Sequence, residues 1–414
     1  MSIRLLFVTS DKYPPMRPAA KFLFGRELPK RDVKVDWLIQ SDSPEPQARK
    51  IESETGTVYL AKTNRSASRA GKVLKHLWDI ANDFRVFSLV FSNKYDVIQV
   101  KDKYLGALTA ALAARLTGAK FCFWIAYPHS EASLAQARSG FAKFRYFSFV
   151  KGWIFGFCLY SFICKFADVV FVQSEQMKKD MAKRGVDEHK MVPVPGSVDI
   201  EEIDTILSNL APPSERNKRV LYVGTLMRIR KLDMLIDAFS DVLSEHPDAT
   251  LDFLGKGEHP KDEELLMSRI RTLGLDNSVR LLGNHSYEEV IKNVSNSAVC
   301  LSPYYPSFIL NSTSPTKLLE YMAVGRPVVG NVHPEQSDVM KSCGCGECVE
   351  WDAEEFAAAI VRLLNDPDSA EAAGGKGRDY ILEHRTHRTM GEKVEAVYLE
   401  LLGKKLDSAS SPLS

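Results

Sequence analysis

The sequence predicts an α/β protein built from two doubly wound, Rossmann-like domains. Three observations lead to this prediction. The chain has 414 residues, whereas a single hydrophobic core stops growing at roughly 250–300 residues. Short runs rich in Val, Ile, Leu and Phe alternate with longer helical patterns along the whole chain. These runs are apolar without alternation, which is typical of parallel strands covered by helices on both faces.

The expected strands fall into two sets, one in each half of the chain. In the first half they are 3–10, 35–40, 96–100, 120–127, 168–174 and 190–195. In the second half they are 219–225, 249–255, 279–284, 298–303, 327–331 and 347–351. Open sheets of this kind bind ligands beyond the carboxyl ends of their strands, so we expect a site in a cleft where two such edges face each other.

The boundary between the domains is expected where Pro193, Pro195 and Gly196 interrupt any regular element. The last strong helical pattern follows the second domain and is expected to pack back on the first. The expected parts are a first domain at 1–195, a second domain at 196–385, the terminal helix at 386–405 and a disordered tail at 406–414.

The charge balance and the cysteines limit the classes of function. Lys and Arg number 54 and Asp and Glu number 53, so no net field draws in nucleic acid. Asp11 and Lys12 come too early for a secretory signal. Seven cysteines without a disulfide pattern favour a reducing compartment. We expect a cytoplasmic protein that does not bind nucleic acid.

A candidate anion site follows the strand that ends at Gly224. The next loop carries Arg228 and Arg230. Glycine lets a ligand approach the backbone closely, and cations at a strand exit suit an anion. The alternative interpretation is a basic turn that is simply solvated.

The stretch SPTKLLEYMAVGRPVVGN, 314–331, predicts a helix whose start binds an anion. Ser314 is expected to cap the helix and Pro315 to take its first position. The free N–H groups of the first turn attract phosphate, and Lys317 adds a full positive charge. Glu320 would repel phosphate but can accept hydrogen bonds from a ribose. We therefore expect a diphosphate and a ribose here, with a plain capped helix as the alternative.

The segments YVGTL, LIDAF and SPTKLLEYMAVGRPVV resemble the donor half of glycosyltransferase family 4, over about residues 165–395. The resemblance implies a GT-B fold and the retaining transfer of a hexosyl group from a nucleoside-diphosphate sugar. It makes Glu320 the ribose-binding glutamate, and it makes Arg230 and Lys317 the cations that neutralise the diphosphate. In the retaining mechanism that it implies, the leaving phosphate receives the proton of the acceptor. No acid pair has metal-binding spacing, so we expect neither a metal ion nor a cofactor besides the donor substrate.

Three positions depart from the family's pattern. Ser312 stands where the family has the first glutamate of a pair, which we interpret as a variant form. Thr225 replaces an arginine, so it is not expected to contact phosphate; more weight then falls on Arg230, with Arg228 as an alternative substitute. The family's glycine pair near the first strand is replaced at 17–20. The donor-facing set is Gly224, Thr225, Arg228, Ser312, Thr313, Ser314, Pro315, Thr316, Leu318 and Glu320.

The first half supplies the acceptor side. Arg17 and Lys21 can provide by charge what the missing glycines do not, although a surface loop is the alternative. His129 follows a strand exit, and the family has a histidine near the transferred sugar. Tyr127 is a weaker candidate on the acceptor side. The catalytic set is therefore His129, Arg230 and Lys317, with a satisfied loop histidine as the alternative for His129.

Residues 141–166 form an aromatic, basic segment without any acid. Its uncharged part between Lys151 and Lys165 is shorter than the roughly 20 residues that span a bilayer. We expect it to lie in a membrane interface, with burial as the alternative. The protein would then be peripheral at the inner face of the membrane and would act on a lipid-linked acceptor of cell-surface polysaccharide synthesis.

Two further expectations concern the cysteine cluster and the competing functions. Cys343, Cys345 and Cys348 lack a nearby fourth ligand, so we expect no zinc site. The leading function is a hexosyltransferase acting on a saccharide or a lipid-linked sugar. The alternatives are a sugar-nucleotide epimerase of the same fold and a catalytically silent sugar-nucleotide binding subunit.

Overall fold

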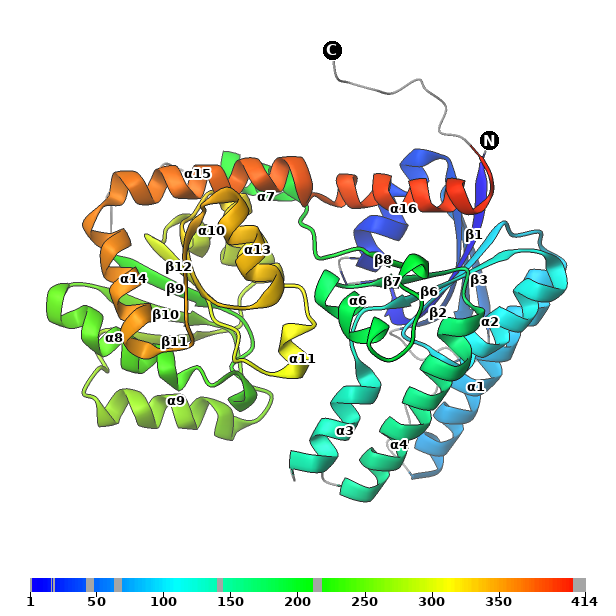
Figure 1. Ribbon diagram of the computed structural model, residues 1–414, viewed down its shortest axis with the longest axis horizontal. Coiled ribbons are helices and arrows are strands. Elements are labelled where there is room, and N and C mark those ends of the chain that lie inside the picture. The colour runs from blue at the N-terminus through cyan, green and yellow to red at the C-terminus, as the bar shows by residue number, and fades with distance from the viewer. Residues whose placement is uncertain are drawn as a thin grey trace, which may run out of the picture. The chain divides into compact units, whose positions relative to one another are not determined.

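A computed structural model describes residues 2–15, 17, 19–41, 48–62, 69–139, 144–210 and 218–404. The expected tail at 406–414 lies outside these residues. The chain divides into two compact units, which Figure 1 shows. Unit 1 comprises Met1–Pro195 and His387–Ser414, and unit 2 comprises Gly196–Thr386.

Unit 1 contains an eight-stranded sheet in the order β3-β4-β2-β1-β5-β6-β7-β8. Its pairs are parallel except β3 with β4. The strands are β1 (Ile3–Tyr13), β2 (Val33–Ser41), β3 (Arg49–Ser53), β4 (Gly56–Ala61), β5 (Val97–Lys101), β6 (Lys120–Ile125), β7 (Val169–Val172) and β8 (Met191–Pro193).

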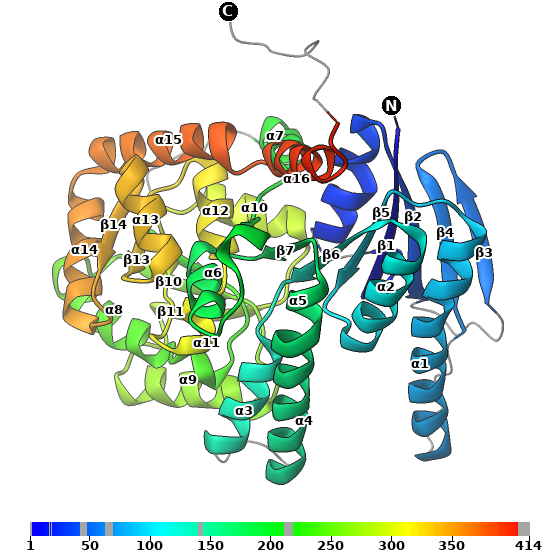
Figure 2. The ribbon, with the colours of Figure 1, turned by 45° about the vertical axis from the view of Figure 1, so that its right-hand side comes forward.

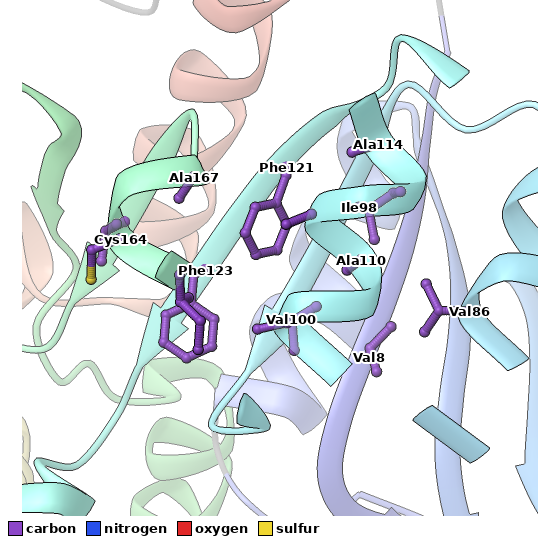
Figure 3. Close-up of a cluster of buried hydrophobic side chains, with 14 of the residues drawn as sticks. Val8, Val86, Ile98, Val100, Ala110, Ala114, Phe121, Phe123, Cys164 and Ala167 are labelled. Atoms are coloured by element: carbon purple, nitrogen blue, oxygen red, sulfur yellow. The ribbon is translucent and has the colours of Figure 1, made fainter. Parts of the chain in front are cut away.

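Helices cover both faces of this sheet. On one face lie α1 (Arg69–Ser92), α2 (Tyr104–Thr117), η3 (Leu159–Ile163), α5 (Cys164–Phe166) and α6 (Glu175–Ala182). Their apolar side chains pack on strand residues such as Val8, Ile98 and Phe121, as Figure 3 shows. The unit also contains α3 (His129–Ser139), α4 (Arg145–Cys158) and the short η4 (Glu188–Lys190).

The other face is covered by η1 (Ala19–Glu27), η2 (Pro29–Arg31) and the terminal helix α16 (His387–Leu401). Met390, Val394 and Tyr398 of α16 are buried in this second core. The hydroxyl of Tyr398 donates to Oε1 of Gln99, at 2.7 Å, in the middle of the sheet. The helix α16 is thus part of the core of unit 1.

Unit 2 contains a six-stranded parallel sheet in the order β11-β10-β9-β12-β13-β14. Figure 2 shows it from a second side. The strands are β9 (Arg219–Val223), β10 (Thr250–Leu254), β11 (Val279–Gly283), β12 (Val299–Ser302), β13 (Val328–Asn331) and β14 (Gly346–Val349).

Two layers of helices bury the two faces of the second sheet. One core includes residues of α8 (Asp233–Glu245), α9 (Pro260–Thr272) and α14 (Ala353–Asn365). The opposite core includes α7 (Ile200–Ser208), α10 (Tyr287–Ser295), α12 (Thr316–Val324), α13 (Pro334–Cys343) and α15 (Pro367–His384). The short η5 (Arg228–Arg230) and α11 (Phe308–Asn311) complete the unit.

Each of the expected strands is present, and both units have the doubly wound architecture. The hairpin of β3 and β4 was missed, and it makes the first sheet mixed, whereas the sequence predicted parallel sheets. Its first strand is mostly exposed and polar, as befits an edge strand. Such a strand lacks the apolar run that reveals a buried one.

Candidate functional site

Two glycines bring the backbone ends of β9 and β10 together in unit 2. Gly224 donates to the carbonyl of Leu254 at 2.8 Å, and its φ is 153°. Gly255 has a φ of 146°, and a Cβ there would lie 1.8 Å from the carbonyl oxygen of Gly224. Neither position accepts a side chain without strain. A narrow, side-chain-free surface therefore lies at the carboxyl ends of these strands.

Lys317 lies directly over this glycine surface. A Cβ at Gly224 would come 2.2 Å from Cε and 3.0 Å from Nζ of Lys317. Lys317 belongs to the first turn of α12. In the same helix, the hydroxyl of Tyr321 accepts from the N–H of Val223 at 2.8 Å, and this bond fixes α12 to β9. The strand exit and the helix start that the sequence singled out separately thus form one site.

The expectation that Ser314 caps α12 was wrong. The helix begins at Thr316, its N-cap is Pro315, and no side chain caps it. Ser314 is buried and accepts instead from the N–H of Gly196 at 2.9 Å, while its hydroxyl donates to Glu335 at 2.8 Å. A buried carboxylate is a strong acceptor, which holds the hydroxyl away from the helix end.

The helix start keeps free donors for a ligand. Within the described residues, the backbone N–H groups of Lys317 and Leu318 have no hydrogen-bond partner. The side chain of Leu318 is fully buried in the core, so only its backbone can face a ligand. Thr316 is exposed. Free N–H groups at a helix start, together with the helix dipole, favour an anion.

Lys317 and Glu320 form an incompletely satisfied pair of charges. Burial and, to a lesser extent, the nearby Arg230 lower the pKa of Lys317, and Glu320 opposes them, which leaves it at about 8. Burial raises the pKa of Glu320, and Lys317 opposes that shift. In the described part of the chain, neither side chain has a hydrogen bond or a salt bridge, although each is partly open to solvent. Charges held this way are costly unless a ligand pairs with them.

Arg230 adds a second cation beside Lys317. It is half-buried at the end of η5, where its Nε donates to the hydroxyl of Thr225 at 3.0 Å. Thr225 itself is exposed and orients this guanidinium. The site therefore combines two cations, a carboxylate and a helix start around Gly224.

Three of the expected donor-facing side chains are engaged elsewhere. Arg228 donates to Asp262 at 2.9 Å and holds the start of α9. The hydroxyl of Ser312 donates to the carbonyl of Phe308 at 3.2 Å, and that of Thr313 donates to Leu310 at 2.7 Å. These bonds close the last turn of α11. The structure does not bring these three side chains to Lys317.

The residues expected on the acceptor side, together with His129, lie in unit 1, after the carboxyl ends of its strands. His129 begins α3, and its ring meets that of Tyr127 edge to face at 5.1 Å. Surrounding protein atoms lower the pKa of His129, and the negative charge of Asp102 opposes this. Arg17 forms an ion pair with Asp11 at 3.2 Å. Lys21 is exposed, and its Nζ lies 4.3 Å from the centre of the Phe22 ring.

Comparisons with known proteins identify the family of this chain. A model described as Glycosyltransferase Family 4 matches residues 22–202. A second, described as Glycosyl transferases group 1, matches residues 217–366. The chain belongs to glycosyltransferase family 4. This agrees with the resemblance seen in the sequence, which rested on the second half.

Solved glycosyltransferase structures share the fold over nearly the whole chain. HepE from Anabaena in complex with UDP has a TM-score of 0.65 and 14% identity, covering 96% of this chain and 100% of that one. Sucrose-phosphate synthase from Thermosynechococcus elongatus has a TM-score of 0.68 and 17% identity, covering 97% and 99%. At such identities the likeness establishes the fold, which is that of GT-B enzymes with two Rossmann-like domains.

Two curated relatives match parts of this glycosyltransferase. The poly(glycerol-phosphate) alpha-glucosyltransferase of Bacillus subtilis is 25% identical over 206 residues, 48% of this chain and 28% of that protein. The GDP-mannose-dependent monoacylated alpha-(1-6)-phosphatidylinositol monomannoside mannosyltransferase of Corynebacterium glutamicum is 25% identical over 165 residues, 39% of this chain and 42% of that protein. The matches span less than half of either relative.

Sequence reasoning missed a buried group of charges in unit 1 of the glycosyltransferase. Lys101 is buried, and its Nζ donates to Asp11 at 2.9 Å and lies 4.0 Å from Oδ2 of Asp102. Oδ1 of Asp102 accepts from the N–H of Ala126 at 2.9 Å, while Oδ2 has no hydrogen-bond partner among the residues that the structure describes. Burial raises the pKa of Asp102. The signal was available, because charged residues directly after buried strands mark a sheet's binding edge.

Glu335 was missed as well. Its Oε1 accepts from Ser314 and lies 3.1 Å from Arg385, whereas its buried Oε2 has no hydrogen-bond partner in the described part of the chain. Burial raises the pKa of Glu335 to about 7, with Arg385 opposing the shift. Ser314, in the loop before α12, binds Gly196, and Glu335 binds both Ser314 and Arg385. Gly196 and Arg385 lie where the chain enters and leaves unit 2, so these bonds join the loop to both places.

The described residues contain no group of three or more His, Cys, Asp or Glu placed to hold a metal ion. Cys343, Cys345 and Cys348 are all free. Contact with Cys345 lowers the pKa of the half-buried Cys343 to about 7.

Proposed function

We propose that this glycosyltransferase moves a hexosyl group from a nucleoside-diphosphate sugar, with retention and without a metal ion, to a saccharide or a lipid-linked sugar. The observation that carries the proposal is the pair of Lys317 and Glu320. Neither side chain has a hydrogen bond or a salt bridge in the described residues, and Lys317 lies over Gly224 and near Arg230 at a helix start, with Glu320 close enough to act on its pKa.

The proposed donor fits this arrangement group by group. The diphosphate would lie over Gly224, with Lys317, Arg230 and the free N–H groups of α12 as its partners. Glu320, one turn further along the helix, would accept hydrogen bonds from the ribose. HepE is crystallised with UDP, and the Corynebacterium relative is named as dependent on GDP-mannose, so donors with either base are candidates.

The cations would act mainly in the transition state. As the bond between the anomeric carbon and the phosphate oxygen breaks, negative charge builds on the diphosphate and positive charge on the sugar. Lys317 and Arg230 stabilise the first charge. The acceptor oxygen then bonds to the anomeric carbon on the same face, and its proton passes to the leaving phosphate. No enzymatic nucleophile and no metal ion are needed for this sequence.

His129, Tyr127, Arg17 and Lys21 are proposed to serve the acceptor and the transferred sugar from unit 1. His129 stands at a helix start among charged groups, so its imidazole can hold a sugar hydroxyl. The names of the relatives include a poly(glycerol-phosphate) glucosyltransferase and a phosphatidylinositol monomannoside mannosyltransferase. These names support a glycoconjugate acceptor, and we propose that the acceptor belongs to cell-surface synthesis and is used in the cytoplasm.

Isothermal titration calorimetry with UDP- and GDP-sugars tests the donor site. Glu320→Ala and Lys317→Ala should each weaken donor binding by about 10- to 100-fold, because each removes a charged hydrogen bond. The control variants are Lys218→Ala and Asp248→Ala, an exposed ion pair before the amino ends of β9 and β10. Unchanged affinity in both site variants would refute the proposal.

Product analysis tests the reaction. Incubation with donor and a panel of saccharide and lipid-linked acceptors should release nucleoside diphosphate only when an acceptor is present, with unchanged turnover in EDTA. Release without any acceptor would indicate an epimerase-like reaction instead. Donor binding without turnover on every acceptor would indicate a silent subunit.

A further inference from the structure

A long apolar helix lies on the outside of unit 1. Within the described residues, one helical stretch, Arg145–Phe166, is long and apolar enough to cross a membrane by length and composition alone. It comprises α4, η3 and α5, and only 22% of its most apolar window is buried. Lys143 and the other residues at 140–143 lie outside the described part. A core helix would be mostly buried, so this one needs another explanation for its composition.

One side of the stretch is attached to the protein. A Cβ at Gly152 would lie 2.8 Å from Leu134 Cγ and 2.9 Å from the carbonyl oxygen of Ser130, both in α3. Further along, Leu159 and Ile163 are buried against the sheet. The helix is therefore held along its length by α3 and the core, and a spanning position would break these contacts.

The opposite side is an aromatic stripe. Tyr146 is 82% exposed, Phe147 68%, Trp153 60% and Phe157 50%. The rings of Trp153 and Phe157 stack with centres 5.8 Å apart, and Phe162 meets Phe157 at 5.5 Å. Trp153 follows Tyr146 by seven residues and Phe157 follows Trp153 by four, so these three side chains lie on one face of the helix, with Phe147 at its edge. Aromatic rings of this density prefer the boundary between water and lipid.

The charges along the stripe are all positive. Arg145, Lys151 and Lys165 are exposed, and no acid occurs between 145 and 166. A further cation, Arg115 of α2, lies 4.7 Å above the ring of Phe166. In a symmetric dimer the stripe would meet its own copy and cations would approach cations. An anionic surface, in contrast, complements the stripe along its whole length.

The apolar surface continues onto the neighbouring helices. Leu112 and Leu116 of α2 are exposed, as are Phe84 and Phe91 of α1. Both views show α2 between α1 and the aromatic stretch (Figures 1 and 2). These helices therefore carry exposed apolar side chains on their outer side, in addition to the buried ones that pack on the sheet.

We propose that the stripe of Tyr146, Phe147, Trp153 and Phe157 lies flat in an anionic membrane surface, with Arg145, Lys151 and Lys165 on the lipid headgroups. The protein binds the membrane from one side and does not span it. If the proposed glycosyltransferase function holds, its acceptor is consequently a sugar carried by a lipid in that membrane, and not a soluble saccharide.

Vesicle co-sedimentation of the full chain tests the membrane contact. Binding should be strong to vesicles that contain phosphatidylglycerol and weak to pure phosphatidylcholine. The apolar variant, F147S/W153S/F157S, and the charge variant, R145E/K151E/K165E, should each bind at least about 100-fold more weakly. The matched controls carry the same number of changes at exposed positions of unit 2: L265S/M267S/L382S and K261E/R271E/K376E.

Each outcome decides the proposal. It is overturned if the wild-type chain stays in the supernatant with anionic vesicles, or if both stripe variants still sediment like the controls. It is also overturned if analytical ultracentrifugation without lipid shows a dimer that the apolar variant converts to a monomer, since the stripe is then a protein interface. Thermal unfolding confirms that each variant is folded.

Activity separates this inference from the proposed function. Donor binding should be equal in the wild type and both stripe variants, while transfer to a lipid-linked acceptor in vesicles should fall with membrane binding. If the donor does not bind any of these proteins but vesicles still do, the proposed function fails and the membrane surface stands. If transfer in vesicles survives the loss of membrane binding, the acceptor assignment fails.

Discussion

Lys317 is a charged side chain that protein atoms largely surround and that we propose binds the donor. Its ammonium group lies against Gly224, where protein atoms displace water, and Arg230 repels it. Both effects disfavour the charged form, so its pKa falls from the usual 10.5 to about 8. A diphosphate at the same place would favour the charged form and restore the proton.

Donor affinity should therefore depend on pH above neutrality. As the pH rises through about 8, Lys317 of the free protein loses its charge, and binding must then take up a proton or proceed without this cation. We expect affinity to fall between about pH 8 and pH 10, with proton uptake visible by calorimetry in buffers of different ionisation enthalpy. Lys317→Met should bind weakly without this pH dependence; an unchanged pH profile in that variant would contradict the assignment.

A side chain at position 224 is disfavoured for two independent reasons. The φ of 153° at Gly224 is unfavourable for other residues, and any Cβ would collide with Lys317. We expect Gly224→Ala to lower the free energy of unfolding by about 1–3 kcal/mol and to weaken donor binding by displacing Lys317. Gly375→Ala is the control, because this exposed helical glycine has nothing within 4 Å of its Cβ position. Chemical denaturation of both variants measures the difference.

Among the helices, α4 depends on glycine for its contact with α3. At Gly152 the approach leaves no room for a methyl group, whereas at Gly156 the nearest atom to an added Cβ is 3.8 Å away. The helix can therefore lie against α3 while its aromatic side chains point outward.

These two glycines should respond oppositely to alanine. Gly156→Ala should stabilise unit 1 by up to about 1 kcal/mol through helix propensity. Gly152→Ala should instead destabilise it by about 1–3 kcal/mol, because the methyl group meets the backbone of α3. Equal effects of the two changes on urea unfolding would show that α3 and α4 are not packed as described.

The chain passes from unit 1 to unit 2 at Gly196 and returns to unit 1 at His387. Unit 1 is completed by α16, whose Tyr398 reaches Gln99 in the centre of the sheet. The last helix therefore contributes to the stability of the unit that contains the first residues, and not to the unit that precedes it in the chain.

This return contact can be measured by truncating Tyr398. Tyr398→Ala should lower the free energy of unfolding of unit 1 by about 3–5 kcal/mol, because a fully buried ring is lost. Tyr398→Phe, which keeps the ring and loses the bond to Gln99, should cost about 1–3 kcal/mol. Hydrogen exchange should show the loss in β1 and β5 and leave the strands of unit 2 unaffected.

Much of the architecture and of the candidate site in unit 2 followed from local patterns. Buried parallel strands require apolar runs, so most of the strands could be located without a structure; the polar edge strand β3 has no such run, and the short run of its buried partner β4 was overlooked. Lys317 and Glu320 were recognisable because a lysine and a glutamate at a helix start have a specific use. The sequence does not reveal that Asp262 lies close enough to accept a hydrogen bond from Arg228, a residue expected to face the donor.

The order of residues along the chain was thus sufficient for the strands, the family and the charges at the start of α12, because each depends on spacing within a short segment. Three features depended on packing between distant segments: the hydroxyl of Ser314 binding Glu335 instead of the helix, the buried group of Lys101 and Asp102, and the outward aromatic face of α4. Hydrogen-bond partners and burial depend on which distant segments come together when the chain folds, and the sequence of one short segment does not specify them.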